Sequence, residues 1–230
     1  GMKFTDAHAT PLCTPSRVQV MTGKYNNRNY MVFGLLNKDE KTFADYLKEA
    51  GYATGVAGKW QLLGNKKQRE KAGGKIGSRP EEVGFDQYCL WQLDELGSRY
   101  KDPTISTTTG TEILKGEFGP DVFSDFAVTF IREHRLRPFF LYYPMVLTHD
   151  PFQPTPDNGD YADMPVKGTN DPKYFRDQVE YMDKIVGRIV AELKSQGLAD
   201  NTLLIFTGDN GTGKKVVSLV DGKEVSGGKG

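Results

Sequence analysis

Helical and extended patterns alternate along this chain, and the alternation limits the folds open to it more than any other feature. Three times a helical pattern precedes a short apolar strand: 42–50 then 52–57, 121–133 then 139–143, and 172–196 then 202–207. Thr42 is suited to cap the first helix and Gly51 to end it. Continuous apolar strands separated by helices are typical of a mostly parallel sheet sandwiched between helices, so we expect an α/β fold.

The composition predicts a single domain. The 230 residues are 37% hydrophobic and 26% charged, enough for one substantial core. The 30 basic and 30 acidic side chains give a formal net charge of zero, so bulk charge provides no basis for binding nucleic acid. No apolar stretch approaches membrane-spanning length, and 1–4 does not resemble an export leader. Any anion site must therefore be a local cluster of Arg and Lys.

Two segments between the periodic elements read as loops that border a site. Residues 64–80 are rich in glycine and basic side chains, and 151–170 is rich in proline and acidic ones. Residues 215–225 predict a hairpin that turns at Asp221 and Gly222. The two cysteines are far apart in sequence and have no metal-binding spacing, so no disulfide framework is expected.

A short helix near the start of the chain places a cysteine where anions bind. Thr14 is suited to cap this helix, Pro15 to be its first residue and Gly23 to end it. Cys13 then lies just before the helix N-terminus, where unpaired N–H groups and the helix dipole favour an anion, and Arg17 adds a charge one turn along. The alternative is that Cys13 is a small buried hydrophobic residue.

Polar residues follow each of the three predicted strands. They are Gly58-Lys59-Trp60-Gln61, Leu147-Thr148-His149-Asp150-Pro151 and Gly208-Asp209-Asn210-Gly211. Ligands of open α/β sheets bind at the carboxyl ends of the strands, so we expect these residues to surround one site. Asp209 and Asn210 offer oxygen ligands that suit Ca²⁺ or Mg²⁺, although this sequence is also a common turn.

The run Cys13-Thr14-Pro15-Ser16-Arg17 resembles the sulfatase signature Cys-x-Pro-Ser-Arg. In that family a formylglycine-generating enzyme oxidises the cysteine to formylglycine, the residue that attacks the sulfate ester. Four motifs follow the family's order between residues 1 and 230. The resemblance implies an alkaline-phosphatase-like fold and hydrolysis of a sulfate ester of a small molecule or carbohydrate.

The resemblance also implies a role for each candidate residue. Cys13 provides the nucleophile and Arg17 helps to control its charge, Lys59 and Lys229 contact the sulfate, and His149 assists the leaving oxygen. Asp209, Asn210 and the modified Cys13 hold a divalent cation, Ca²⁺ or Mg²⁺. Gln61 stands where the family usually has a histidine, and a glutamine does not titrate near neutral pH.

The resemblance further implies a partial catalytic-domain core over residues 1–230, truncated at both ends. The family's first metal-binding strand and its smaller C-terminal subdomain are expected to be absent. Loss of that strand removes two carboxylates, which predicts weak cation binding. It also exposes a sheet edge or a gap in the sheet, which predicts a homodimer through the edge or poor solubility. Export to the periplasm or secretion is the expectation for the full-length parent.

Two other functions remain open at this stage. One is a catalytically silent protein that binds sulfated ligands through Arg17, Lys59 and Lys229, and the other is a phosphoesterase of the same superfamily. His8, His134 and Cys89 are expected to be structural. An aromatic side chain could stack on a sugar or an aryl ring of the substrate, and the candidates are Trp60, Tyr88, Trp91 and Phe152.

Overall fold

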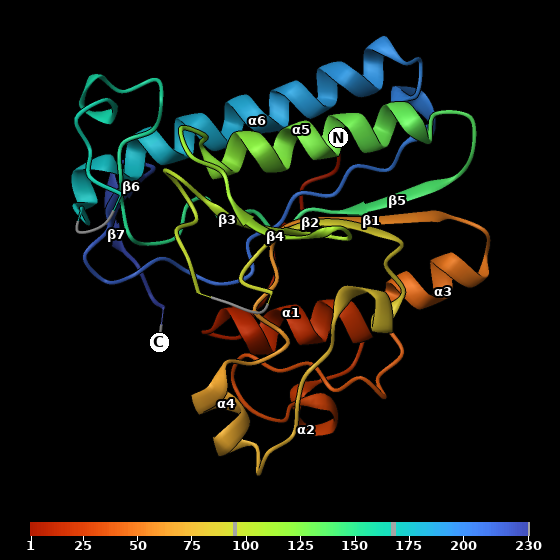
Figure 1. Cartoon of the computed structure of the whole chain (residues 1–230). Helices are drawn as coiled ribbons and strands as arrows, with labels where there is room; N and C mark the ends of the chain where they lie inside the picture. The colour runs from red at the N-terminus through yellow and green to blue at the C-terminus, as the bar shows by residue number, and fades with distance from the viewer. Residues whose placement is uncertain (94–95, 167–168, 230) are drawn as a thin grey trace.

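The computed structural model of the protein describes residues 1–93, 96–166 and 169–229, and consists of a sheet between two layers of helices (Figure 1). The strands are β1 Ala53–Lys59, β2 Gln87–Trp91, β3 Thr104–Thr107, β4 Gly110–Ile113, β5 Phe139–Tyr142, β6 Val217–Val220 and β7 Lys223–Ser226. The α-helices are α1 Cys13–Thr22, α2 Asn26–Asn29, α3 Phe43–Glu49, α4 Lys66–Lys71, α5 Gly119–Glu133 and α6 Phe175–Ser195. Short 3₁₀ helices span Pro80–Val83, Gly159–Tyr161, Pro172–Tyr174 and Ala199–Asn201.

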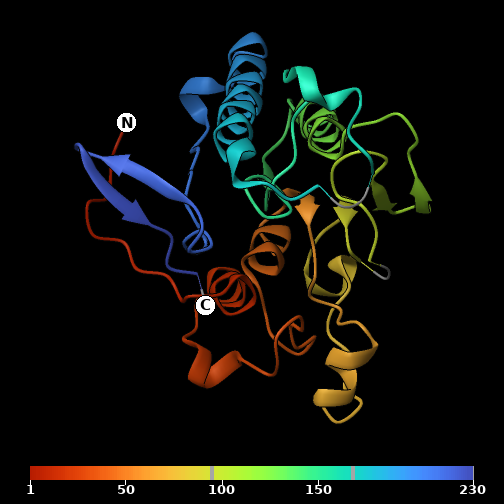
Figure 2. The same cartoon turned by 90° about the vertical axis from the view of Figure 1, so that its left-hand side faces the viewer.

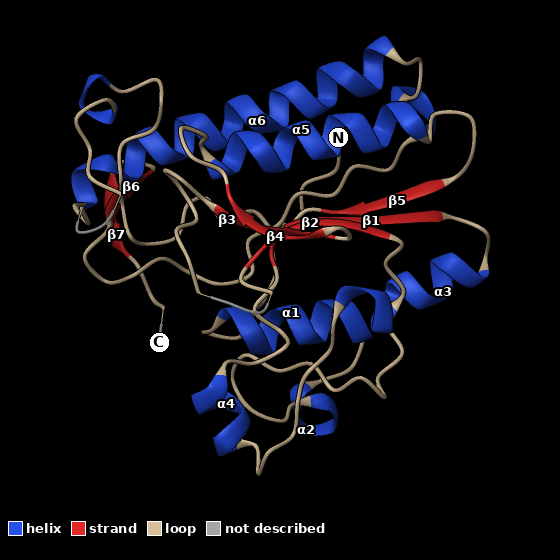
Figure 3. Cartoon of the chain, viewed as in Figure 1, coloured by secondary structure: helices blue, strands red, loops and turns tan. Residues whose placement is uncertain are grey.

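The main sheet has five strands in the order β4-β3-β2-β1-β5. β1 pairs in parallel with β2 and with β5, whereas β3 and β4 continue the sheet in antiparallel orientation. The α/β fold is therefore confirmed, but the sheet is mixed because β2, β3 and β4 follow one another without an intervening helix (Figure 3). Every residue of β1 is buried, as expected for a strand covered on both faces.

Alternate residues of β1 face two hydrophobic cores. Val56 packs in a core with Val18 and Met21 of α1, on the face that α1 and α3 cover. Ala57 packs on the opposite face with Phe123 of α5 and Tyr181 of α6. Figure 1 shows the two helix layers above and below the sheet. The sheet is thus held from both sides, and the carboxyl ends of its central strands are firmly placed.

Most of the predicted elements are confirmed, with boundaries shifted by a few residues. Thr42 caps α3, and its hydroxyl accepts hydrogen bonds from the backbone N–H groups of Ala44 and Asp45 in a capping box. The helices over 121–133 and 172–196 correspond to α5 and α6. β6 and β7 form the expected hairpin, which turns at Asp221 and Gly222 and stands outside the main sheet (Figure 2).

Several expectations about local structure are wrong. The helix α1 begins at Cys13, so Cys13 does not precede it and Pro15 is its third residue rather than its first. Thr14 does not cap α1, because it lies inside the helix and its hydroxyl accepts a hydrogen bond from the backbone N–H of Gly34. Residues 64–80 are not all loop, since Asn65 caps α4. Residues 202–207 do not form a strand: no described strand pairs with them, and Leu203 is 86% exposed.

Gly58 precedes the last residue of β1 and has no room for a side chain. Its φ is +103°, and a Cβ there would lie 2.3 Å from the carbonyl oxygen of Pro144. Gly58→Ala is expected to lower the free energy of unfolding by about 1–3 kcal/mol from the backbone alone, with the clash in addition. Gly187→Ala, in open space on α6, is the control and is expected to raise stability by about 1 kcal/mol. Equal effects of the two changes in urea unfolding would refute this account of Gly58.

Candidate functional site

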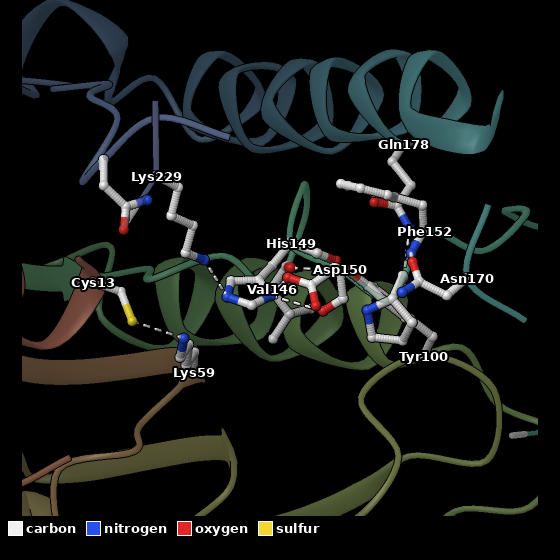
Figure 4. Close-up of polar contacts among 12 residues, drawn as sticks. Cys13, Lys59, Tyr100, Val146, His149, Asp150, Phe152, Asn170, Gln178 and Lys229 are labelled. Atoms are coloured by element: carbon white, nitrogen blue, oxygen red, sulfur yellow. Dashed lines mark hydrogen bonds and ion pairs between the residues drawn. The ribbon is translucent and has the colours of Figure 1, made fainter. Parts of the chain in front are cut away.

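Cys13 and Lys59 meet at the carboxyl end of β1. Cys13 is the first residue of α1, and its side chain is buried, with the residue 4% exposed. Lys59 is the last residue of β1, and its Nζ lies 3.3 Å from Cys13 Sγ (Figure 4). The sulfur therefore lies between a helix N-terminus and a lysine, two features that both favour negative charge.

The Lys59 ammonium group is more acidic in this position than in water. Burial lowers the pKa of Lys59 from 10.5 to about 8. The charge and hydrogen bond of Cys13 act in the opposite direction, and the charges of Arg17 and Arg99 lower the pKa further. Lys59 is thus a buried cation that titrates close to the physiological range and is stabilised by any anion beside it.

Arg17 donates hydrogen bonds to the backbone at the end of β1. Its Nη1 donates to the Lys59 carbonyl oxygen at 2.8 Å, and its Nη2 donates to the Trp60 carbonyl oxygen. Its Nε is buried and has no hydrogen-bond partner. Both terminal nitrogens therefore hold the backbone that carries Lys59. The charge of Arg17 also lowers the pKa of Lys59.

His149 is held between Lys229 and Asp150. Lys229 Nζ lies 2.6 Å from His149 Nε2, and His149 Nδ1 lies 2.7 Å from the Asp150 carbonyl oxygen (Figure 4). Because a lysine ammonium only donates hydrogen bonds, Nε2 accepts and the ring proton lies on Nδ1. Burial, followed by the charges of Lys59 and Arg99, lowers the pKa of His149 to about 4. The imidazole is therefore neutral at neutral pH.

Lys229 reaches the site from the segment that follows β7. Its backbone N–H donates to the Thr212 carbonyl oxygen at 2.9 Å, and Gly227 N–H donates to the Val216 carbonyl oxygen at 3.0 Å. Figures 1 and 2 agree that this segment runs towards α1. Gly230 lies outside the described residues. The structure thus brings Lys229 to His149 from almost the far end of the sequence.

Tyr100 fixes the backbone of His149 and was not indicated by the sequence. Its hydroxyl lies 2.6 Å from the His149 carbonyl oxygen and 3.0 Å from that of Val146. Burial raises its pKa well above the usual value, so the phenol keeps its proton and donates. Neither Tyr100 nor its neighbour Arg99 belongs to a motif or follows a predicted strand, so the sequence offered no signal for them.

Asp209 and Asn210 are the two side chains that the sequence predicts as cation ligands. Asn210 Oδ1 is buried without a hydrogen-bond partner, and Asn210 Nδ2 donates to Asp209 Oδ1 at 3.0 Å. An orphaned amide oxygen beside a carboxylate fits a hard cation. Within residues 1–93, 96–166 and 169–229, however, no three His, Cys, Asp or Glu side chains are grouped as metal ligands. These two donors are fewer than the six to eight oxygens that Ca²⁺ takes.

Gln61 lies two residues beyond the end of β1 in an unusual conformation. Its φ is +48°, and its Oε1 is buried without a hydrogen-bond partner. Its backbone N–H donates to the Gln92 carbonyl oxygen at 3.0 Å, which continues the pairing of β1 with the chain beyond β2. The side chain thus has an unused acceptor where the resemblance places a histidine.

The proposed stacking of an aromatic side chain on substrate is not supported. All four candidates are buried, between 0% and 7% exposed: Trp60, Tyr88, Trp91 and Phe152. Cys89 is buried in the core, and burial raises its pKa to about 12. His134 packs against the Phe130 ring at 4.4 Å, and exposed His8 pairs with Asp6.

The comparisons with known proteins agree on one family. The sulfatase family model matches residues 1–228. N-acetylgalactosamine-6-sulfatase of Canis lupus familiaris is 29% identical, over 92% of this chain and 43% of the relative. N-acetylgalactosamine-6-O-sulfatase of Bacteroides thetaiotaomicron is also 29% identical, over 92% of this chain and 52% of the relative. The chain therefore spans about half the length of these relatives.

Solved structures give the same fold. The crystal structure of Ps i-CgsB in complex with k-i-k-neocarrahexaose is 25% identical to this chain and has a TM-score of 0.65. The match covers 84% of this chain and 46% of that one. In the part of the chain that the structure describes, no helix is both long and apolar enough to cross a membrane. With a family model that matches almost every residue and a shared alkaline-phosphatase-like fold, this chain belongs to the sulfatase family.

Proposed function

We propose that this chain carries the nucleophile-bearing part of a sulfuric ester hydrolase in which Cys13 is converted to formylglycine. The observation that supports this most directly is the 3.3 Å contact between Lys59 Nζ and Cys13 Sγ at the start of α1. A helix N-terminus and a buried ammonium group together make a site for a tetrahedral anion. A hydrated formylglycine would supply two hydroxyl groups, one for attack on sulfur and one for release of sulfate.

A sulfated carbohydrate is the proposed substrate class. The N-acetylgalactosamine sulfatases named above act on a sulfated sugar, and Ps i-CgsB binds a neocarrahexaose. Selectivity for the sugar would come from the loops around the site, which include 64–80 and the described part of 151–170. Residues 167–168 lie outside the described residues.

The chain's own residues divide the work in the proposed reaction. Lys59 holds an oxygen of the sulfate beside Cys13, and Arg17 fixes the backbone at the end of β1. Lys229, which donates to His149 Nε2, is the group placed to give a proton to the departing oxygen. His149 is neutral at neutral pH and its Nε2 accepts from Lys229, so it orients the ammonium group of Lys229, which regains its proton from solvent.

A divalent cation is part of the proposal, because the family generally works with one. Asp209 and Asn210 would be two of its ligands, with the modified Cys13 as a third. Two side-chain donors fit a cation only in part, so we expect weak binding of Ca²⁺ or Mg²⁺ by residues 1–230 and derive no step from it.

The proposed function is tested by co-expression with a formylglycine-generating enzyme. The peptide that contains Cys13 is expected to lose about 18 Da, the difference between CH₂SH and CHO. Hydrolysis of p-nitrophenyl sulfate and p-nitrophenyl phosphate is then compared with and without Ca²⁺. Turnover of the sulfate only, and only after conversion, supports the proposal. Equal turnover of the phosphate favours a phosphoesterase, and binding of sulfate without turnover favours a catalytically silent protein.

Sulfate binding is expected to weaken as the pH rises through about 8. The pKa of Lys59 is lowered to about 8, so the ammonium form predominates below this pH and is lost above it. The affinity for sulfate at pH 9 should be about tenfold lower than at pH 7, as measured by isothermal titration calorimetry. Lys59→Met should bind weakly at both pH values, whereas Lys66→Met, on exposed α4, should behave like the unchanged chain. An unchanged affinity between pH 7 and 9 would contradict this role of Lys59.

A homodimer through the free edge of the sheet is also proposed. β5 pairs only with β1 among the described strands, and residues 202–207 expose apolar side chains. Unpaired strand edges and exposed apolar runs both promote association between chains. Sedimentation velocity is expected to show a dimer that dissociates when Ile205 and Phe206 are both replaced by lysine. A monomer at all concentrations would refute the homodimer.

Export of the parent protein likewise remains a proposal, to be tested by cell fractionation.

A further inference from the structure

Arg99 lies beside the site on the connection between β2 and β3, and the mechanism above does not use it. Its guanidinium carbon lies 3.9 Å from the centre of the Trp91 ring. Trp91 ends β2 and is paired in register with Lys59, which ends β1. The next residue, Tyr100, lies within hydrogen-bond distance of the His149 carbonyl oxygen. Arg99 therefore packs beside the end of β2 that pairs with Lys59, and its neighbour Tyr100 contacts the backbone of His149.

The guanidinium group of Arg99 has a nitrogen that makes no described hydrogen bond. Its Nη1 is buried and has no hydrogen-bond partner among the described residues, its planar group stacks on Trp91, and the charge of Asp150 acts on it. A buried donor that is left unpaired costs free energy, which a ligand would recover. The stacking holds the planar group in one orientation, and such a fork matches the two oxygens of a carboxylate or sulfate.

The other cations of the site are already engaged. Arg17 donates to two backbone carbonyl oxygens, Lys59 to Cys13 Sγ, and Lys229 to His149 Nε2. The positive charge of Arg99 lowers the pKa of both Lys59 and His149. A sulfate monoester brings one negative charge, and Lys59 is the cation in contact with Cys13. Asp150 is the described carboxylate whose charge acts on Arg99, and its Oδ1 also lies 2.9 Å from His149 Nδ1, so Arg99 keeps a free guanidinium donor for a group other than the sulfate beside Cys13.

We propose that Arg99 determines specificity by binding a second anionic group of the substrate, a sulfate or a carboxylate on the sugar whose sulfate is placed at Cys13. This inference rests on the proposed function. It predicts that the chain prefers sulfated sugars that carry two anionic groups over those that carry one.

Binding measurements with unconverted Cys13 test the inference without turnover. The probes are N-acetylgalactosamine 6-sulfate, N-acetylgalactosamine 4,6-disulfate, and the disaccharide in which glucuronic acid is linked to N-acetylgalactosamine 6-sulfate. At least one probe with a second anionic group should bind about tenfold more tightly than the monosulfate, and the preferred probe tells sulfate from carboxylate. Arg99→Gln should abolish this preference and leave monosulfate affinity within about twofold.

Two variants serve as controls. Arg135→Gln removes the same charge from an exposed turn that precedes β5, at the opposite end of the strands, and should keep the preference. Arg99→Lys keeps the charge but lacks the planar fork, so it should retain only part of the preference. Thermal unfolding of each variant shows whether the fold is intact.

Each result has a definite meaning. The inference is overturned if the unchanged chain shows no preference, or if Arg99→Gln weakens all three probes equally, as a residue that binds the reacting sulfate would. Hydrolysis of p-nitrophenyl sulfate by the converted chain reports separately on the proposed function, because this ester has no second anionic group. Hydrolysis without a preference for two anionic groups refutes only the role of Arg99. A chain that neither hydrolyses this ester nor binds any probe refutes both proposals.

Discussion

Cys13→Ala is expected to reduce sulfate ester hydrolysis by about 10⁴-fold or more, because no other described group takes the position of the nucleophile. Cys13 occupies the first position of α1, with Lys59 Nζ at 3.3 Å from its sulfur. Alanine lacks the thiol that the maturation enzyme oxidises, so no aldehyde forms, while Lys59, His149 and Lys229 stay in place. The measurement is kcat for p-nitrophenyl sulfate after co-expression with the maturation enzyme.

The second cysteine provides the matched control for this change. Cys89 is buried among apolar side chains on the face of the sheet covered by α5 and α6, and burial raises its pKa to about 12. Cys89→Ala should keep kcat within a few-fold of the unchanged chain while it lowers stability, and its Cys13 peptide should still lose about 18 Da. Retention of turnover in Cys13→Ala would remove the nucleophile from the proposed mechanism.

Trp60→Ala is expected to lower the free energy of unfolding by about 3–5 kcal/mol, a large part of the stability of a typical domain. Trp60 is fully buried, its Nε1 donates to the Ser78 carbonyl oxygen at 2.8 Å, and its ring meets that of Phe85 edge to face. The change opens a cavity and leaves a buried carbonyl oxygen without its donor. Urea unfolding followed by circular dichroism measures the loss.

Trp60→Phe separates the two contributions. Phenylalanine keeps most of the ring volume but not the indole N–H, so a smaller loss of about 1–2 kcal/mol is expected. The backbone carbonyl of Trp60 accepts from Arg17, so a shift of this backbone towards the cavity in the alanine variant should also lower sulfate affinity. A loss below about 1 kcal/mol in the alanine variant would show that the core closes over the cavity.

The local pattern of the sequence predicted much of the fold because periodicity and capping act over short distances. α3 begins after Thr42 because a capping box needs only four consecutive residues. Thr14 has the same chemistry, yet its hydroxyl accepts from Gly34, twenty residues away. An apolar run over 202–207 predicts a strand only if a neighbouring strand pairs with it, and among the described residues none does.

In the site, too, the sequence predicted the features that depend on local pattern but not the contacts that depend on tertiary structure. Cys13, Lys59 and His149 lie at a helix start or after a strand, so the rule for α/β sheets predicted that they would meet. The contact of Lys229 with His149 depends on how the hairpin folds back, which no local pattern specifies. Arg99 was missed because its importance comes from stacking on Trp91, and tertiary packing alone decides that contact.

The contact between Lys229 and His149 has a consequence for how the protein responds to heat. Lys229 follows the β6–β7 hairpin, whose eight strand residues are all exposed. Two backbone hydrogen bonds hold this segment, from Lys229 to Thr212 and from Gly227 to Val216. Such a segment opens at a lower free energy than the buried sheet. Function should therefore be lost by reversible detachment of this segment while the sheet is still folded, so the working temperature limit of the protein lies below its melting temperature.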